Sequence, residues 1–238
     1  MMRSWIFTGI SDKRDLLLYL SRLLAVSGLR VLLVDATERQ TYRYSISKLD
    51  KHIPVTEFYG FEVADGFFSD EGLREYLEQQ GTDIKSYDIV IYDLEKLSFG
   101  STEIWLEAES VWWVSSMDRF EVERSTEWFA RLLQMYPKLQ GIFIRTVFLH
   151  HLDCRISPEY VQMLASGLPV KWSEEPLTIA TDELAYAAKI ENGHDRAISL
   201  RRLTRTYKKS ISQLVVQVAG WKGAQAKRAL KLAERRKA

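Results

Sequence analysis

The chain has 238 residues, of which 46% are hydrophobic, and its formal net charge is only +1. This length fits one large domain with an ample core. No apolar run approaches the roughly 20 residues that span a bilayer, and the N-terminus lacks the apolar segment of a signal peptide. The single cysteine, Cys154, excludes an internal disulfide and suits a reducing compartment, so we expect a cytoplasmic protein.

The start of the chain predicts a strand, a helix and a second strand. Residues 4–9 form a short apolar run. Residues 12–27 place leucines at three- and four-residue spacing, which is typical of an amphipathic helix. Residues 30–35 form a second apolar run that ends in Asp35. A strand, a helix and a strand joined by short links predict a βαβ unit with parallel strands.

The rest of the chain continues this alternation. We expect strands at residues 56–63 (or a hairpin there), 87–93, 110–115, 139–148 and 169–172, and helices at residues 70–80, 119–136, 158–166, 182–189, 198–218 and 221–237. Such alternation predicts an α/β fold with a mainly parallel, doubly wound sheet and helices on both faces. We assign residues 1–220 to this domain and residues 221–238 to a basic C-terminal helix or tail.

Three of these strands resemble strands of the MinD/ParA group of deviant P-loop ATPases. Residues 28–36, Gly-Leu-Arg-Val-Leu-Leu-Val-Asp-Ala, resemble the second strand of that family. Residues 87–93, Tyr-Asp-Ile-Val-Ile-Tyr-Asp, resemble its Walker B strand, and Gly-Ile-Phe-Ile-Arg at residues 141–145 resembles a later strand that ends near the adenine. The resemblance extends over residues 4–220 and implies a P-loop NTPase-like fold.

The resemblance also implies where a nucleotide would bind, at the carboxyl edge of the sheet. Lys13 falls at the phosphate-binding lysine, judged by its offset from Asp35. In an active enzyme Asp93 would hold magnesium through water, Asp35 would assist, and Lys13 would contact phosphate, so these three would be the catalytic residues. The candidate cofactor-binding residues are Gly9, Lys13, Arg14 and Arg145, with Arg145 at the place of the family's adenine-reading Asn.

The turn before the first helix departs from the family's glycine-rich phosphate loop. Residues 9–15, Gly-Ile-Ser-Asp-Lys-Arg-Asp, have one glycine, and backbone amides wrap a phosphate closely only where side chains do not intrude. Arg14 replaces the hydroxyl residue that would hold magnesium. Asp12 and Asp15 have capping-box spacing, so we expect them to cap the helix and to occupy the anion site.

Two hypotheses of function follow. The first is a scaffold or positioning protein, non-catalytic or weakly nucleotide-binding, that needs no cofactor and acts through protein partners as a homodimer. Lys13 is then a surface lysine, and Asp35 and Asp93 are ordinary acids at strand ends. The second is an active but divergent ATPase that uses ATP and magnesium to partition DNA or to position a cell-surface or secretion machine.

Charge is distributed very unevenly along the chain. Residues 195–238 carry 13 Lys and Arg against two Asp and Glu, whereas the preceding residues carry 20 against 30. This asymmetry predicts that the C-terminal part meets an acidic surface. The candidate surface-binding residues are Trp221, Lys222, Lys227, Arg228, Lys231, Arg235 and Arg236. Three alternatives stay open: a solvated or protein-docked tail, an anchor on anionic membrane at its inner face, or a non-specific DNA-binding segment.

One loop contains side chains that can bind metals. His150, His151, Asp153 and Cys154 lie close together in the sequence. Their spacing matches no standard zinc pattern, and only one thiol is present. We therefore expect a solvated loop without a metal.

Overall fold

The computed structural model describes residues 2–46 and 53–235, and within these ranges it contains one sheet of nine strands. The strands are β1 (Arg3–Thr8), β2 (Val31–Ala36), β3 (Val55–Phe58), β4 (Phe61–Ala64), β5 (Ile89–Leu94), β6 (Ser110–Ser116), β7 (Phe143–His151), β8 (Lys171–Trp172) and β9 (Leu177–Ala180). Their order in space is β3-β4-β2-β5-β1-β6-β7-β8, and β9 also pairs with β7. Every pairing is parallel except that of β3 with β4, which confirms the predicted, mainly parallel α/β fold.

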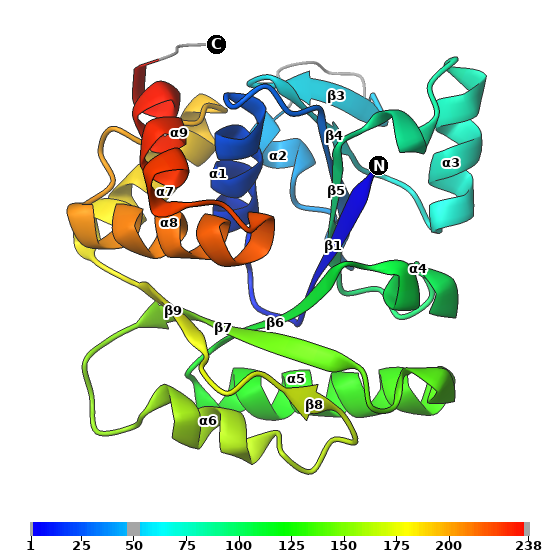
Figure 1. Ribbon diagram of the computed structural model, residues 1–238, viewed down its shortest axis with the longest axis vertical. Coiled ribbons are helices and arrows are strands. Elements are labelled where there is room, and N and C mark those ends of the chain that lie inside the picture. Colours follow the sequence, from blue (N-terminus) through cyan, green and yellow to red (C-terminus); the bar gives the residue numbers. More distant parts are fainter. Residues whose placement is uncertain (1, 47–52, 236–238) are drawn as a thin grey trace.

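Helices cover both faces of this sheet (Figure 1). They are α1 (Arg14–Ala25), α2 (Arg43–Ile46), α3 (Asp70–Gln79), α4 (Thr102–Glu107), α5 (Arg119–Met135), α6 (Pro158–Leu164), α7 (Glu183–Asp195), α8 (Arg205–Ala219) and α9 (Gly223–Arg235). One apolar core lies under α1, α7, α8 and α9, and a second lies under α3, α4, α5 and α6. Trp112 enters the first core and Trp113 the second, because successive side chains of a strand point to opposite faces.

The C-terminal third differs most from the predicted elements. Helix α8 begins at Arg205 rather than at residue 198, because Thr204 caps it by accepting a hydrogen bond from the Tyr207 amide. The preceding segment is not helical and buries Ile198 and Leu200 in the core. Helices α2 and α4 and strand β9 were not predicted, since runs of four to six residues carry too little periodicity to be assigned.

Helix α9 lies directly on the body of the protein. It contacts α1 and α8, and its buried side chains are those of Ala226, Ala229 and Ala233. The small alanines allow the helix to approach its neighbours closely. Within the described part of the chain, no helix is both long and apolar enough to cross a membrane.

Candidate functional site

The loop between β1 and α1 lies at the carboxyl edge of the sheet, near its middle. Strand β1 pairs with β5 on one side and with β6 on the other. Asp35 and Asp93 lie next to each other in register on β2 and β5. Because parallel strands end at the same edge, the structure brings Gly9, Lys13, Asp35 and Asp93 together, as the sequence predicts.

The loop begins with a glycine that no other residue can replace without strain. Gly9 has a φ of +119°, and a Cβ atom built on it would lie 2.2 Å from the carbonyl oxygen of Val114 in β6. Ser11 fastens the loop further, since its Oγ accepts a hydrogen bond from the Ser116 amide at 3.1 Å and donates one to Glu121. The loop is therefore packed tightly against β6 and tied to α5.

Lys13 is buried, with 2% of its side chain exposed. Its Nζ lies 2.7 Å from Oδ1 of Asp93 and donates a hydrogen bond to the Gly9 carbonyl oxygen at 2.8 Å. The prediction of a surface lysine is therefore wrong. Lys13 is the N-cap residue of α1, and its side chain folds back over the short loop to reach the end of β5.

The second oxygen of Asp93 is held by a tyrosine from the segment that follows β2. The Tyr42 hydroxyl donates a hydrogen bond to Oδ2 of Asp93 at 2.8 Å, and both residues are buried. Burial raises the pKa of Asp93, and the Lys13 ammonium opposes this shift. Burial beside Asp93 and Asp35 raises the pKa of Tyr42 well above its ordinary value. Both oxygens of the Asp93 carboxylate are thus occupied by groups of the protein.

Asp35 holds the same segment in place through both of its oxygens. Its Oδ1 accepts hydrogen bonds from the Thr37 amide at 3.0 Å and the Thr37 hydroxyl at 2.6 Å, while Oδ2 accepts one from the Tyr42 amide at 3.2 Å. Burial raises the pKa of Asp35, against the effect of these hydrogen bonds. Sequence reasoning missed Tyr42 because it lies in a polar run, and only its aromatic ring signalled burial.

The space next to this network is small. A cavity of about 90 Å³ is lined by loop residues, by Asp93 and by two further acids, Asp12 and Glu95. It has room for only a few water molecules, whereas pockets for drug-sized ligands measure roughly 300–1,000 Å³. Its lining carries these three carboxylates and two cations, Lys13 and Arg39.

The predicted capping box at the start of α1 forms only in part. The helix begins at Arg14, and its N-cap residue is Lys13, whose side chain forms no capping hydrogen bond. Asp12 accepts one from the Arg14 amide at 3.1 Å, but Asp15 turns away and accepts one from the Tyr207 hydroxyl at 3.2 Å. Lys189 lies 3.3 Å from the carboxylates of both Asp12 and Asp15. The helix starts two residues later than predicted, so Asp15 faces α7 and α8 instead of the free amides.

The two candidate arginines lie in different places. Arg14 stays beside the loop, where its guanidinium donates to the Thr41 carbonyl at 3.1 Å. Arg145 is the third residue of β7, and its guanidinium lies over the rings of Trp112 and Phe143. Strand β7 continues to His151, so Arg145 does not reach the carboxyl edge where an adenine-reading residue would stand.

The candidate surface-binding residues lie on or next to α9. Trp221 is partly buried and packs against the core, so its ring is not presented to solvent as a membrane anchor would be. The exposed members of the group are Lys222, Lys227, Arg228, Lys231 and Arg235, while Arg236 lies outside the described residues. Within the part of the chain that the structure describes, no group of three or more His, Cys, Asp or Glu residues could hold a metal ion.

Comparisons with solved structures establish the fold. No protein-family model and no curated protein sequence matches this chain. It is similar to the cell division protein MinD from Aquifex aeolicus, with a TM-score of 0.62 and 13% identity over 92% of this chain and 98% of MinD.

Two further solved structures are similar to this chain over nearly its whole length. A ParA family ATPase from Chlorobium tepidum has a TM-score of 0.53 and 14% identity over 99% of this chain and 100% of its own. The MinC:MinD complex from Aquifex aeolicus has a TM-score of 0.55 and 11% identity over 98% of this chain and 95% of the chain in that structure. The chain therefore has the fold of the MinD/ParA-type P-loop ATPases.

Proposed function

We propose that this protein is a positioning or scaffold protein with a MinD/ParA-type fold that acts through protein contacts and does not turn over ATP. The single observation that carries this proposal is the position of Lys13, whose ammonium group is held by Asp93 and by the Gly9 carbonyl. A phosphate-binding lysine has to present its charge to the β- and γ-phosphates. Here a ligand would first have to separate a buried ion pair, and that separation is costly.

The surrounding groups also fit a magnesium triphosphate poorly. P-loop enzymes hold the metal with a loop Ser or Thr and a Walker B Asp. In this chain Arg14 follows the lysine, and the Asp93 carboxylate is occupied by Lys13 and Tyr42. The cavity beside Lys13 and Asp93 measures only about 90 Å³, below the roughly 300–1,000 Å³ of pockets for drug-sized ligands.

A role in positioning draws on the similarity to MinD, which is a cell division protein and forms a complex with MinC. We propose that this chain likewise binds protein partners and forms a homodimer through the face around the loop. An open groove of about 460 Å³ next to the loop, lined by Trp128, Met135 and Arg124 among others, supports this choice of face. Met135 is 52% exposed there and lines the groove beside Trp128.

Isothermal titration with a magnesium–AMPPNP solution tests the proposal. We expect no heat of binding up to about 1 mM nucleotide, the upper end of common KM values, and no hydrolysis of ATP. The proposal fails if the protein hydrolyses ATP and if Lys13→Ala abolishes that activity. Lys85→Ala is the matched control, because Lys85 is exposed and precedes β5, at the opposite edge of the sheet from the loop.

The competing function is an active, divergent ATPase, and one observation favours it. Lys13 and Asp93 meet at the carboxyl edge of the sheet, where a phosphate-binding lysine and a magnesium-holding acid would both be needed. In that case nucleotide would draw Lys13 away from Asp93. Magnesium–ATP would then raise the melting temperature in a concentration-dependent way, whereas the scaffold proposal expects no shift.

A further inference from the structure

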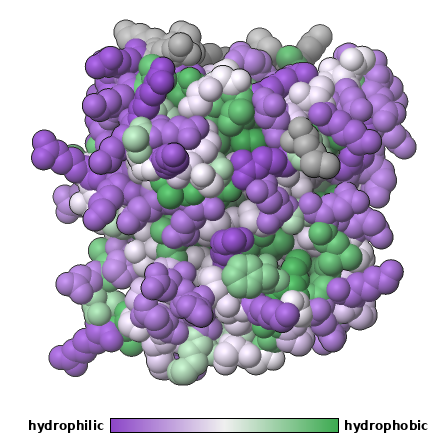
Figure 2. Space-filling model, in the orientation of Figure 1, coloured by the Kyte–Doolittle hydropathy of each residue, from purple (hydrophilic) through white to green (hydrophobic). Residues whose placement is uncertain are grey.

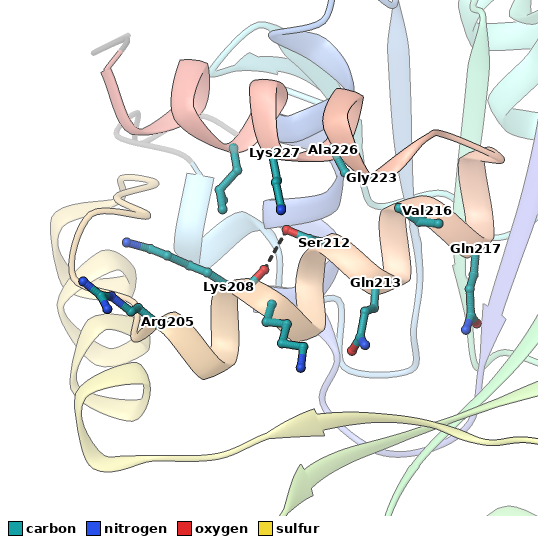
Figure 3. A pocket seen from close by; sticks show the side chains of 11 residues that line it. Arg205, Lys208, Ser212, Gln213, Val216, Gln217, Gly223, Ala226 and Lys227 are labelled. Carbon is teal, nitrogen blue, oxygen red and sulfur yellow. Dashed lines mark hydrogen bonds between the residues drawn. The ribbon is translucent and has the colours of Figure 1, made fainter.

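Helices α8 and α9 leave an open groove between them, apart from the loop site (Figure 3). The groove has a volume of about 480 Å³. Val216, Ala226 and Leu230 contribute apolar walls, and Figure 3 shows Lys227 reaching from α9 toward α8. The space-filling view of the same side shows hydrophobic residues exposed between hydrophilic ones over these helices (Figure 2).

The charged residues that line this groove are all basic. Its lining includes Arg205, Lys208, Lys209 and Lys227 and contains no acidic residue. Lys208 is neutralised by Glu234 at 2.6 Å. The other three are exposed and form no ion pair with any residue that the structure describes.

Arg205 has an unfavourable interaction with the dipole of its own helix. Arg205 is the first residue of α8, and the first turn of that helix contains no acid. The helix dipole disfavours a positive charge at this end and favours an anion. A negatively charged ligand in the groove would therefore interact favourably with Arg205, Lys209 and Lys227 and with the dipole of α8.

The dimensions of the groove fit an elongated ligand. Its lining on α8 runs from Arg205 to Gln217, a rise of about 18 Å at 1.5 Å per residue. This corresponds to about three turns of a helix, the length over which an amphipathic helix places apolar side chains in a hydrophobic groove.

Neither a bilayer nor a nucleic acid matches these features as well. The most apolar face of α9, formed by Ala226, Ala229 and Ala233, is turned inward, so the docked helix offers no apolar stripe to a membrane. No aromatic residue lines the groove to stack on bases, and phosphates gain nothing from its apolar walls.

We propose that the α8–α9 groove docks an acidic amphipathic helix of a protein partner. Apolar side chains on one face of that helix fill the space beside Val216 and Leu230. Carboxylates at its flanks meet Arg205, Lys209 and Lys227. This inference goes beyond the proposed function and does not depend on whether the loop binds nucleotide.

Fluorescence anisotropy with a labelled synthetic peptide tests the inference on the full chain. The probe is a stapled helix of about 14 residues, which spans about 21 Å, with Leu at i, i+4 and i+7 and Glu at the flanking positions. We expect micromolar binding that weakens about tenfold in Lys227→Glu and also in Gln213→Glu, since both residues are exposed and line the groove. Circular dichroism and thermal unfolding verify that each variant is folded.

Three controls make the outcome decisive. Lys85→Glu introduces the same charge reversal at an exposed lysine that does not line the groove, and it should leave binding unchanged. A peptide with Lys in place of every Glu should not bind. The inference is overturned if the acidic peptide does not bind, or if Lys227→Glu and Lys85→Glu weaken it equally. It is also overturned if phosphatidylserine-containing vesicles or duplex DNA bind through Lys227 and the peptide does not compete with them.

Discussion

The loop site and the α8–α9 groove both gather charged side chains, but they differ in what neutralises the charge. In the loop site, Lys13 and Asp93 are each 2% exposed and pair with each other. In the groove, Arg205, Lys209 and Lys227 are exposed and have no acidic partner among the described residues. The charges of the loop site are neutralised within the chain. Those of the groove are free to meet the charges of another molecule.

This difference separates charges that stabilise the fold from charges that are available to bind a ligand. A buried ion pair is held in place because removal of either partner leaves an uncompensated charge out of water. An exposed, unpaired cluster creates instead a field that attracts ligands of opposite sign. A net charge of +1 hides both arrangements, so the position of each charge carries more information about function than the total.

The largest expected effect comes from breaking the pair in the loop site. Lys13→Met removes the cation and leaves the buried Asp93 carboxylate with the Tyr42 hydroxyl alone. We expect a loss of about 3–5 kcal/mol in the free energy of unfolding, measured by urea titration at pH 7.

The double variant Lys13→Met, Asp93→Leu supplies the control. Removal of both charges leaves no buried charge without a partner, so we expect it to recover part of the lost stability, less the cost of the Tyr42 hydroxyl that loses its acceptor. If Lys13→Met unfolds at the same urea concentration as the natural chain, Lys13 is not part of a structural pair, and the contrast between the two regions disappears.

A smaller effect is expected where the loop touches β6. Gly9→Ala would place a methyl group 2.2 Å from the Val114 carbonyl oxygen at a φ of +119°, so backbone has to move. We expect a loss of about 2–4 kcal/mol from the combination of backbone strain and overpacking. The matched variant Gly81→Ala also has a positive φ, +72°, but meets no atom within 4 Å. It should lose only about 1–2 kcal/mol. Equal losses in the two variants would show that the loop is not tightly packed.

Local patterns predicted the fold well, because apolar runs and leucine spacing record which faces are buried. They also placed Lys13, Asp35 and Asp93 at one edge, since parallel strands end together. The inward turn of Lys13 and the insertion of Tyr42 depend on contacts between segments far apart in the sequence, which no local pattern records. The sequence also did not show that β7 continues to His151, and this length keeps Arg145 away from the carboxyl edge of the sheet.

The unpaired groove cations could not be recognised from the sequence either. The excess of Lys and Arg in residues 195–238 predicted an acidic partner surface, but not which cations lack an internal partner. Lys208 meets Glu234 at 2.6 Å only because α8 and α9 pack together. Tertiary packing thus selects Arg205 and Lys227 from many similar side chains as those left unpaired.

The smallest effect is expected at Asp12, which lies between the buried network and the solvent. Burial acts to raise the pKa of Asp12, but the charges of Lys189 and Arg14 and the Arg14 amide outweigh it and hold the pKa below the ordinary value of 3.8. A lowered pKa means that the charged form stabilises the fold. This contribution is fully present above pH 3.8 and is lost as the pH falls through the lower pKa of the folded state.

Asp12→Asn removes this charge and keeps an oxygen that can accept from the Arg14 amide. We expect it to cost less than about 1 kcal/mol at pH 7, because Asp12 is half-exposed and water screens its pair with Lys189. Urea titrations at pH 7 and at successively lower pH should show the difference from the natural chain shrinking only below pH 3.8. Asp195→Asn, at an exposed acid with no charged partner among the described residues, should show no such difference. A gap that persists in strong acid would mean that the Asp12 charge does not stabilise the fold, and the ion pair with Lys189 would then belong with the surface charges rather than with the loop network.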